Sequence, residues 1–252
     1  MDNATLYAVT HKSINIIPER VLIGVGKNRN LTNVSVYDNT GINISKKNAN
    51  YCELTALFWV WKNDNSDIVG LEHYRRQFVI NGSLATKKEL VTLLNNYDII
   101  VPKRANLPSS IYHDYVHKHS EEELILTEKY IKNKCPSYLK SFEQMKYENK
   151  IRLCNMFVAK KWVINEYCKW LFDILFGIEE FVNLDSRSDY NKRVFGFLSE
   201  RLFNVYLSSH PELRIYDLNI SEPSDSHLQR FSIINEIKYH FKRTINYEGM
   251  YR

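Results

Sequence analysis

The chain has 252 residues, a length that favours one large domain with a C-terminal extension. Hydrophobic residues make up 44% and charged residues 25%, which excludes a disordered chain, a fibrous repeat and a membrane-embedded protein. The formal net charge of +5 permits an anionic ligand, but it is too small to indicate a nucleic-acid-binding protein.

The four cysteines, Cys52, Cys135, Cys154 and Cys168, form no Cys-x-x-Cys pair, so a zinc ribbon and a redox couple are excluded. We expect reduced and mostly buried thiols in a cytoplasmic protein. Residues 1–21 lack the basic segment and apolar core of a signal peptide. No run reaches the roughly 18 apolar residues of a membrane-spanning helix, so we expect membrane contact only at the surface.

In the first half of the chain, short apolar runs rich in β-branched residues alternate with amphipathic stretches. The runs at 6–10, 21–25, 67–71 and 97–102 predict strands, and the stretches at 51–62 and 87–95 predict helices. This order predicts an α/β fold with a mostly parallel central sheet and helices on both faces. Ligands of such sheets bind beyond the carboxyl ends of the strands, here near residues 10–12, 38–45 and 72–76.

The second half is more helical. We predict helices at 121–134, 137–149, 161–182 and 194–208, and a strand at 152–159. Residues 1–220 are assigned to one domain, and residues 221–252 to an amphipathic basic tail. That tail is expected either to lie on a membrane surface or to pack on the domain.

The segment 70–76, Gly-Leu-Glu-His-Tyr-Arg-Arg, gives the strongest functional signal, because a buried strand leads directly into His73, Tyr74, Arg75 and Arg76. The planar guanidinium group matches phosphate oxygens, and two of them can hold much of the charge of a diphosphate. If the strand continues straight, alternation places only one arginine on the ligand face. The alternative is that the arginines pair with carboxylates at a sheet edge.

Two further clusters have simpler explanations. Residues 38–43, Asp-Asn-Thr-Gly-Ile-Asn, suit ribose hydroxyls or base edges, but their composition fits a self-stabilised turn better. His113, His117 and His119 stand near acidic residues and resemble a zinc site, yet they lack the His-Glu-x-x-His order. The acidic run that follows them is typical of a solvated first helical turn.

Glu200 and Arg201 stand near the start of an otherwise apolar predicted helix. A buried glutamate there is a candidate general base with a raised pKa. The alternative is an ion pair on the helix.

No glycine-rich phosphate loop and no Gly-x-Ser-x-Gly elbow occurs, which disfavours nucleotide triphosphatases, NAD enzymes and serine hydrolases. The Asp-x-Asp pair that commonly binds a metal in nucleotide-sugar transferases is absent from the first half.

The segments 38–63, 67–78, 154–161 and 193–207 resemble one bacterial family with a Gly-Leu-x-His-Tyr-Arg-Arg signature, and the run from Asn43 to Arg76 is the most specific part of the resemblance. It is a family of capsule and exopolysaccharide glycosyltransferases, long catalogued as a domain of unknown function, which includes galactofuranosyltransferases. The resemblance extends from residue 10 to about residue 206. It implies a GT-A-like nucleotide-diphospho-sugar transferase fold.

The resemblance also implies roles for individual residues. Donor binding falls to Thr10, His11, Asp38, Gly41, Asn43, His73, Tyr74, Arg75, Arg76, Asn155 and Arg201. Glu53 opens the helix behind the donor, and His119 and Glu123 contact the acceptor. The chain departs from the family at Glu72, where a small or apolar residue is expected. Glu72 introduces either a metal ligand or a partner that neutralises an arginine.

The predicted function is inverting transfer of galactofuranose or another hexose from a UDP-sugar, without a cofactor or a divalent metal. Glu200, or as second choice Asp114, takes the proton of the acceptor, while Arg75 and Arg76 stabilise the leaving phosphate. The expected acceptor is a lipid-linked or free oligosaccharide of a capsule, exopolysaccharide or O-antigen, at the cytoplasmic face of the inner membrane.

Two alternatives stay open. One is an inactive UDP-sugar-binding protein of polysaccharide assembly. The other is a metal-dependent hydrolase built on His113, His117 and His119.

Overall fold

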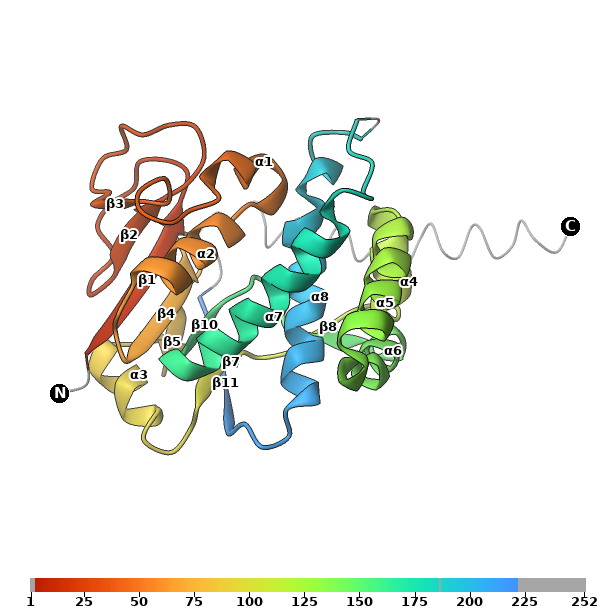
Figure 1. The fold of residues 1–252 in the computed structure, drawn as a ribbon. Coiled ribbons are helices and arrows are strands. Elements are labelled where there is room, and N and C mark those ends of the chain that lie inside the picture. Colours follow the sequence, from red (N-terminus) through yellow and green to blue (C-terminus); the bar gives the residue numbers. More distant parts are fainter. Residues whose placement is uncertain (1–2, 186, 222–252) are drawn as a thin grey trace, which may run out of the picture.

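A nine-stranded sheet with helices on both faces forms the centre of the computed structural model, which describes residues 3–185 and 187–221 (Figure 1). The strand order is β3-β2-β1-β4-β10-β7-β11-β5-β6. Parallel pairing joins β3, β2, β1 and β4, and also β7 with β11, while β10 is antiparallel to both of its neighbours. The prediction of an α/β fold with a mostly parallel central sheet is confirmed.

The strands are β1 (Ala4–Thr10), β2 (Val21–Gly24), β3 (Val36–Tyr37), β4 (Ile68–His73), β5 (Phe78–Ile80), β6 (Ser83–Leu84), β7 (Ile99–Pro102), β10 (Phe157–Lys160) and β11 (Ile215–Ile220), with β8 (Ala105–Asn106) and β9 (Lys150–Ile151) in a separate two-stranded sheet. The α-helices are α1 (Asn48–Tyr51), α2 (Leu54–Asn63), α3 (Lys87–Leu93), α4 (Ile111–Lys118), α5 (Glu122–Lys134), α6 (Leu139–Tyr147), α7 (Lys161–Glu179) and α8 (Val194–Ser209). Short 3₁₀ helices cover η1 (Ser45–Lys47), η2 (Pro136–Tyr138) and η3 (Asn191–Arg193).

The apolar core divides between the two faces of the sheet. Alternate residues of the central strands, such as Leu71 and Phe157, belong to a large core that includes side chains of α2, α7 and α8. Their neighbours Gly70 and Val158 point the other way, where a smaller core gathers around α3 and Phe78. Because β1 and β4 are parallel and paired up to Val9 and His73, their carboxyl ends open at one edge.

Two predicted elements are shorter than their hydrophobic pattern suggests. The predicted helix 51–62 is divided into α1 and α2 at Cys52, whose φ is 52°. The predicted strand 152–159 begins only at Phe157, because Cys154 and Asn155 have φ angles of 79° and 48°, in the left-handed region. Both interruptions lie beside the cavity described below, so they shape its wall.

The assigned tail, residues 221–252, lies outside the described residues except for Ser221, so its role remains a prediction. In the described part of the chain, no helix is both long and apolar enough to cross a membrane.

Candidate active site

A cavity of about 630 Å³ opens at the carboxyl ends of β1 and β4. It is walled by the ends of these strands, by the junction between α1 and α2, and by the segment that leads into α8. The polar or charged side chains that line it are Thr10, His11, Asn48, Cys52, Glu53, His73, Tyr74, Arg75, Arg76, Cys154, Asp189, Lys192, Arg193 and Glu200. The cavity thus lies at the edge of the sheet where the rule for parallel strands predicts a ligand site.

The chain reverses direction directly after β4. The backbone N–H of His73 donates to the carbonyl oxygen of Arg76 at 3.1 Å, and the N–H of Arg76 donates back to His73 at 3.0 Å. This tight turn replaces the straight strand that alternation assumes, so His73, Tyr74, Arg75 and Arg76 all line the cavity. The condition under which only one arginine would face the ligand, a straight strand, is therefore not met, and both arginines line the cavity.

The guanidinium groups of Arg75 and Arg76 have no hydrogen bond or ion pair to any residue in 3–185 or 187–221. Arg75 lies over the ring of Tyr74, with 5.3 Å between its Cζ and the ring centroid. Both positive charges help to lower the pKa of His73, although burial of the ring is the larger cause. The cavity thus holds cationic groups without a matching protein counter-ion, which favours an anionic ligand.

Glu72 neutralises an arginine, as the second of the two alternatives from the sequence expects, and that arginine is Arg20. Its carboxylate accepts hydrogen bonds from Arg20 Nε at 2.8 Å and Nη2 at 3.2 Å, and both side chains are completely buried. The Oε1 atom also accepts the backbone N–H of Phe78 at 2.9 Å. Glu72 therefore neutralises Arg20, leaves the two cavity arginines free, and fixes the base of the turn between β4 and β5.

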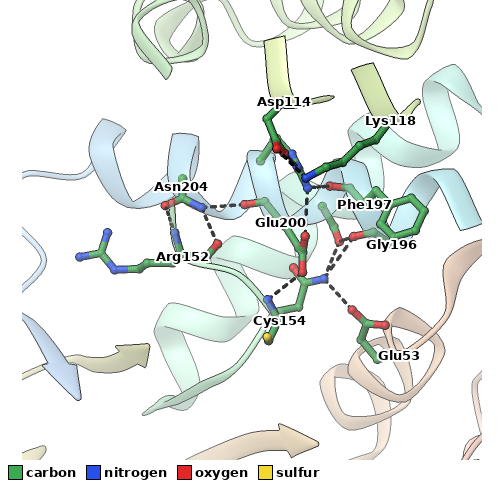
Figure 2. A network of polar contacts seen from close by, with 12 residues as sticks. Glu53, Asp114, Lys118, Arg152, Cys154, Gly196, Phe197, Glu200 and Asn204 are labelled. Carbon is green, nitrogen blue, oxygen red and sulfur yellow. Dashed lines mark hydrogen bonds and ion pairs between the residues drawn. The ribbon is translucent and has the colours of Figure 1, made fainter. Parts of the chain in front are cut away.

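Glu200 reaches the cavity from the second turn of α8 (Figure 2). Its Oε1 accepts the backbone N–H of Cys154 at 2.7 Å, and its Oε2 accepts Arg201 Nη1 at 3.0 Å. Burial raises the pKa of Glu200 above its ordinary value, while the charge of Arg201 and the bond from Cys154 oppose that shift. A largely buried carboxylate with a raised pKa is suited to general base chemistry.

His73 is held in one tautomer. Its Nε2 contacts the carbonyl oxygen of Cys154 at 2.5 Å, and a carbonyl only accepts hydrogen bonds, so Nε2 carries the hydrogen. Burial lowers the pKa of His73, so the ring is neutral at pH 7 and Nδ1 is left as an acceptor. The backbone of Cys154 thus contacts both residues, with its N–H bonded to Glu200 and its carbonyl oxygen to His73.

Glu53 is a second carboxylate that lines the cavity. The resemblance places it at the start of the helix behind the donor but implies no chemical role for it. Its Oε1 accepts Asn155 Nδ2 at 2.8 Å, and the same amide donates to Ser199 Oγ at 2.8 Å (Figure 2). Asn155 is buried beneath this contact and does not line the cavity. The position of Glu53 just before an amphipathic helix was readable from the sequence, but its contact with a residue 102 positions away was not.

Arg193 is another cavity residue that sequence reasoning missed. Its Nε donates to Cys52 Sγ at 3.1 Å, and its Cζ lies 5.3 Å from the ring centroid of Phe197. Lys192 and Asp189, which stand 3.7 Å apart at their charged atoms, accompany it. The available signal was the basic pair immediately before the apolar run of α8.

Asp114 and Arg201 lie behind Glu200 and outside the cavity lining. Arg201 Nη2 is 3.4 Å from Asp114 Oδ2, and Lys118 Nζ is 2.5 Å from Oδ1 (Figure 2). This ion-paired chain orders Glu200. Of the two carboxylates predicted as the base, Glu200 lines the cavity and Asp114 does not.

Asp38, Gly41 and Asn43 do not line the cavity either. Asp38 is buried and pairs with Arg29 at 2.7 Å. Gly41 has a φ of 53°, and a Cβ there would overlap the side chain of Asn63. Asn43 bonds within its own turn, as the simpler interpretation of this loop expects, and the implied uridine contacts remain predictions.

His119 and Glu123 join α4 and α5 to the segment after α7, outside the cavity lining. The ring of His119 stacks on Phe197 with centroids 4.2 Å apart, and its Nδ1 contacts Asn191. Glu123 is fully buried and pairs with Arg187. An acceptor role for His119 and Glu123 remains a prediction.

No three His, Cys, Asp or Glu side chains gather in a group that fits a metal ion anywhere in residues 3–185 and 187–221. His113 and His117 are both exposed on α4. The proposed zinc group of His113, His117 and His119 therefore does not form in the described part of the chain.

The comparisons with known proteins agree with this geometry. The model of a family described as a domain of unknown function (DUF4422) matches residues 5–211. The chain belongs to the DUF4422 family. It is also similar to a solved structure titled "WbbM bifunctional glycosytransferase apo structure", with a TM-score of 0.78 and 26% identity over 89% of the chain.

The similarity covers 46% of that second protein, so the DUF4422 chain spans about half its length. No curated protein matches the sequence. All the residues that line the cavity lie within the family match, which includes the turn at 73–76 and Glu200.

Proposed function

We propose that this DUF4422 protein is a glycosyltransferase that uses a nucleoside-diphospho-sugar. The observation that carries the proposal is a pair of guanidinium groups, those of Arg75 and Arg76, that have no hydrogen-bond or ion-pair partner among the described residues, in a cavity that also contains the carboxylate of Glu200. The similarity to a solved structure whose title names a glycosyltransferase supports it.

In the proposed reaction, Arg75 and Arg76 hold the diphosphate and stabilise the negative charge that develops on the leaving phosphate. Preorganised donors of this kind contribute most where water is excluded. The neutral ring of His73, next to them on the turn, offers Nδ1 as an acceptor for a hydroxyl group. Because the guanidinium groups supply the positive charge, we propose that turnover needs no divalent cation.

Glu200 acts as the general base. Its carboxylate removes the proton from an acceptor hydroxyl, and the oxygen of that hydroxyl bonds to the anomeric carbon as the bond to the diphosphate breaks. Attack from the face opposite the leaving group inverts the configuration. Arg201 and the N–H of Cys154 orient Glu200 and prevent its pKa from rising further.

The finer proposal names UDP as the nucleotide and galactofuranose or another hexose as the sugar, on the resemblance through the Gly-Leu-x-His-Tyr-Arg-Arg segment. The proposed acceptor is a lipid-linked or free oligosaccharide of a bacterial surface polysaccharide. The proposed location is the cytoplasmic side of the inner membrane.

A donor screen tests the proposal. The purified chain is offered UDP-galactofuranose, UDP-galactose, UDP-glucose and their N-acetyl forms with a simple glycoside, in excess EDTA, and products are read by mass spectrometry. We expect one donor to be consumed and Arg75→Ala to lower turnover on the order of 10²-fold. An exposed arginine that does not line the cavity, changed as Arg104→Ala, is the matched control.

Each other outcome has a distinct meaning. A strict requirement for Mn²⁺ would refute the metal-free mechanism. Tight UDP binding without transfer to any acceptor would favour the inactive binding protein. Absence of UDP binding would refute UDP as the nucleotide, and absence of binding to every nucleoside diphosphate would refute the proposed function altogether.

A further inference from the structure

Glu53 is a cavity carboxylate for which the proposed mechanism has no task. It stands immediately before α2, it is half-buried, and it lines the cavity. One oxygen, Oε1, is engaged by Asn155. No residue of 3–185 or 187–221 hydrogen-bonds the other oxygen, Oε2, and Oε2 is not sealed from solvent. It is therefore an open acceptor inside the site.

Asn155 is built to hold Glu53 in place. It is 3% exposed, and its amide nitrogen donates to Glu53, to Ser199 Oγ and, at 3.3 Å, to the carbonyl of Gly196. The backbone of Asn155 is left-handed, with a φ of 48°, and its amide bridges Glu53, just before α2, to Gly196 and Ser199 of α8. A residue held at this many points fixes the direction of the carboxylate that it contacts.

The cavity extends over the interval between the turn at 73–76 and Glu200, and Glu53 lines this same cavity. Its negative charge acts on His73, at the turn that carries the two cavity arginines, and also on Glu200. A transferred sugar must occupy this interval, because its anomeric carbon joins the leaving diphosphate on one side and meets the acceptor oxygen on the other. The carboxylate of Glu53 repels phosphate oxygens but accepts hydrogen bonds from hydroxyl groups.

We propose that Glu53 binds hydroxyl groups of the donor sugar and that Asn155 is its positioning residue. This inference rests on the proposed function and assigns the sugar subsite within it. A charged acceptor at a fixed position discriminates between sugars by the orientation of a hydroxyl, because a misplaced hydroxyl leaves the carboxylate without that hydrogen bond while the bound sugar keeps water from replacing it. Glu53 is then a determinant of donor specificity.

The test separates binding of the sugar from binding of the nucleotide. Calorimetry measures the Kd of UDP and of the UDP-sugar in the screen that the wild-type chain binds most tightly. For Glu53→Gln we expect an unchanged Kd for UDP and a Kd for the UDP-sugar that is weaker by roughly tenfold to hundredfold, the usual effect of losing a hydrogen bond to a charged group. Glu143→Gln, at an exposed site on α6, is the charge-matched control and should change neither.

Asn155→Gly tests the positioning role, since glycine tolerates the left-handed backbone and removes only the amide. The same selective loss is expected, because a merely structural defect would weaken UDP and UDP-sugar alike. Glu53→Asp, which keeps the charge, replaces Glu53→Gln if that variant does not fold.

The outcomes are distinguishable. If wild-type protein binds UDP and a UDP-sugar but Glu53→Gln weakens both equally or neither, the inference is wrong and the proposed function stands. If Glu53→Gln binds the UDP-sugar normally but loses turnover, Glu53 is a proton acceptor, which also overturns the inference. If wild-type protein binds no UDP-sugar, both fail together.

Discussion

The buried pair of Arg20 and Glu72 leads to a sharp prediction about stability. Arg20→Met keeps much of the length and apolar character of the side chain but removes the two hydrogen bonds, of 2.8 and 3.2 Å, to a carboxylate that is 0% exposed. Glu72 then retains only the backbone N–H of Phe78. We expect a loss of about 3–5 kcal/mol in the free energy of unfolding, because a buried charge is left without its partner.

The magnitude follows from two opposing effects. At about 3 Å and an effective dielectric constant of about 20, opposite charges attract by roughly 5 kcal/mol. Removing both from water costs several kcal/mol for each ion, so the net contribution of the intact pair is small. Removing one partner abolishes the charge–charge attraction, but the desolvation cost of the remaining buried ion stays. Adding Glu72→Gln to Arg20→Met should therefore restore about 2 kcal/mol, because the amide still accepts from Phe78 without a buried charge.

Urea unfolding of the full chain, followed by circular dichroism, measures these changes. The control is Arg104→Met, which breaks an ion pair with Glu148 whose side chains are 39% and 43% exposed, and which should cost no more than about 1 kcal/mol. The reasoning is refuted if Arg20→Met costs less than the control, or if Glu72→Gln adds to the loss instead of relieving it.

Three further predictions concern pH and backbone conformation. Glu200 must be ionised to act as a base, and its pKa is raised, so the turnover should fall as the pH falls through that raised value. Glu200→Gln should lower the turnover about 10²-fold or more and should abolish this decrease at acid pH. A pH-independent wild-type rate down to about pH 4 would contradict this. Hydrogen bonds from Arg214 lower the pKa of Asp98, so ionised Asp98 stabilises the folded chain above about pH 4, and this contribution is lost as the pH falls further. Asp98→Asn should therefore lower the free energy of unfolding, measured in urea, by about 2 kcal/mol at pH 7 and by less in acid. Equal losses at both pH values would refute it. Gly41→Ala should lower the free energy of unfolding by about 1–2 kcal/mol, because Gly41 has a positive φ and an added Cβ would overlap Asn63. Calorimetry should show no change in the Kd of UDP. Weaker binding of UDP by a folded variant would instead support the implied donor contact.

The sheet and the edge at which the cavity opens could be predicted from the sequence because buried parallel strands are continuous apolar runs. The run that became β4 led directly to the cavity arginines. The tight turn after His73 could not be predicted, since nothing local in His-Tyr-Arg-Arg demands it, and the carboxylate of Glu72 closes its base through distant Arg20. Strand β11 escaped detection because its alternating residues are mostly solvent-exposed or half-buried.

The composition of the site was harder to predict than its position. Asp114 and Arg201 were expected in contact with the substrate, yet the structure places them behind Glu200, where charged residues form a supporting chain. Glu53 was placed near the donor by resemblance, but its role depends on Asn155, which contacts it across 102 positions. Side-chain contacts over such separations leave no periodicity in the sequence.

The left-handed elbow at Cys154 has a consequence for how this family varies. Its main-chain N–H and carbonyl serve Glu200 and His73, while its thiol, whose pKa burial raises to about 12, takes no part in either contact. Any residue that tolerates the left-handed conformation can therefore do the same work. Relatives can therefore carry another residue type at this position and keep both backbone contacts. A search for conserved residue types would then miss this position, although its backbone links Glu200 to His73 in the candidate active site.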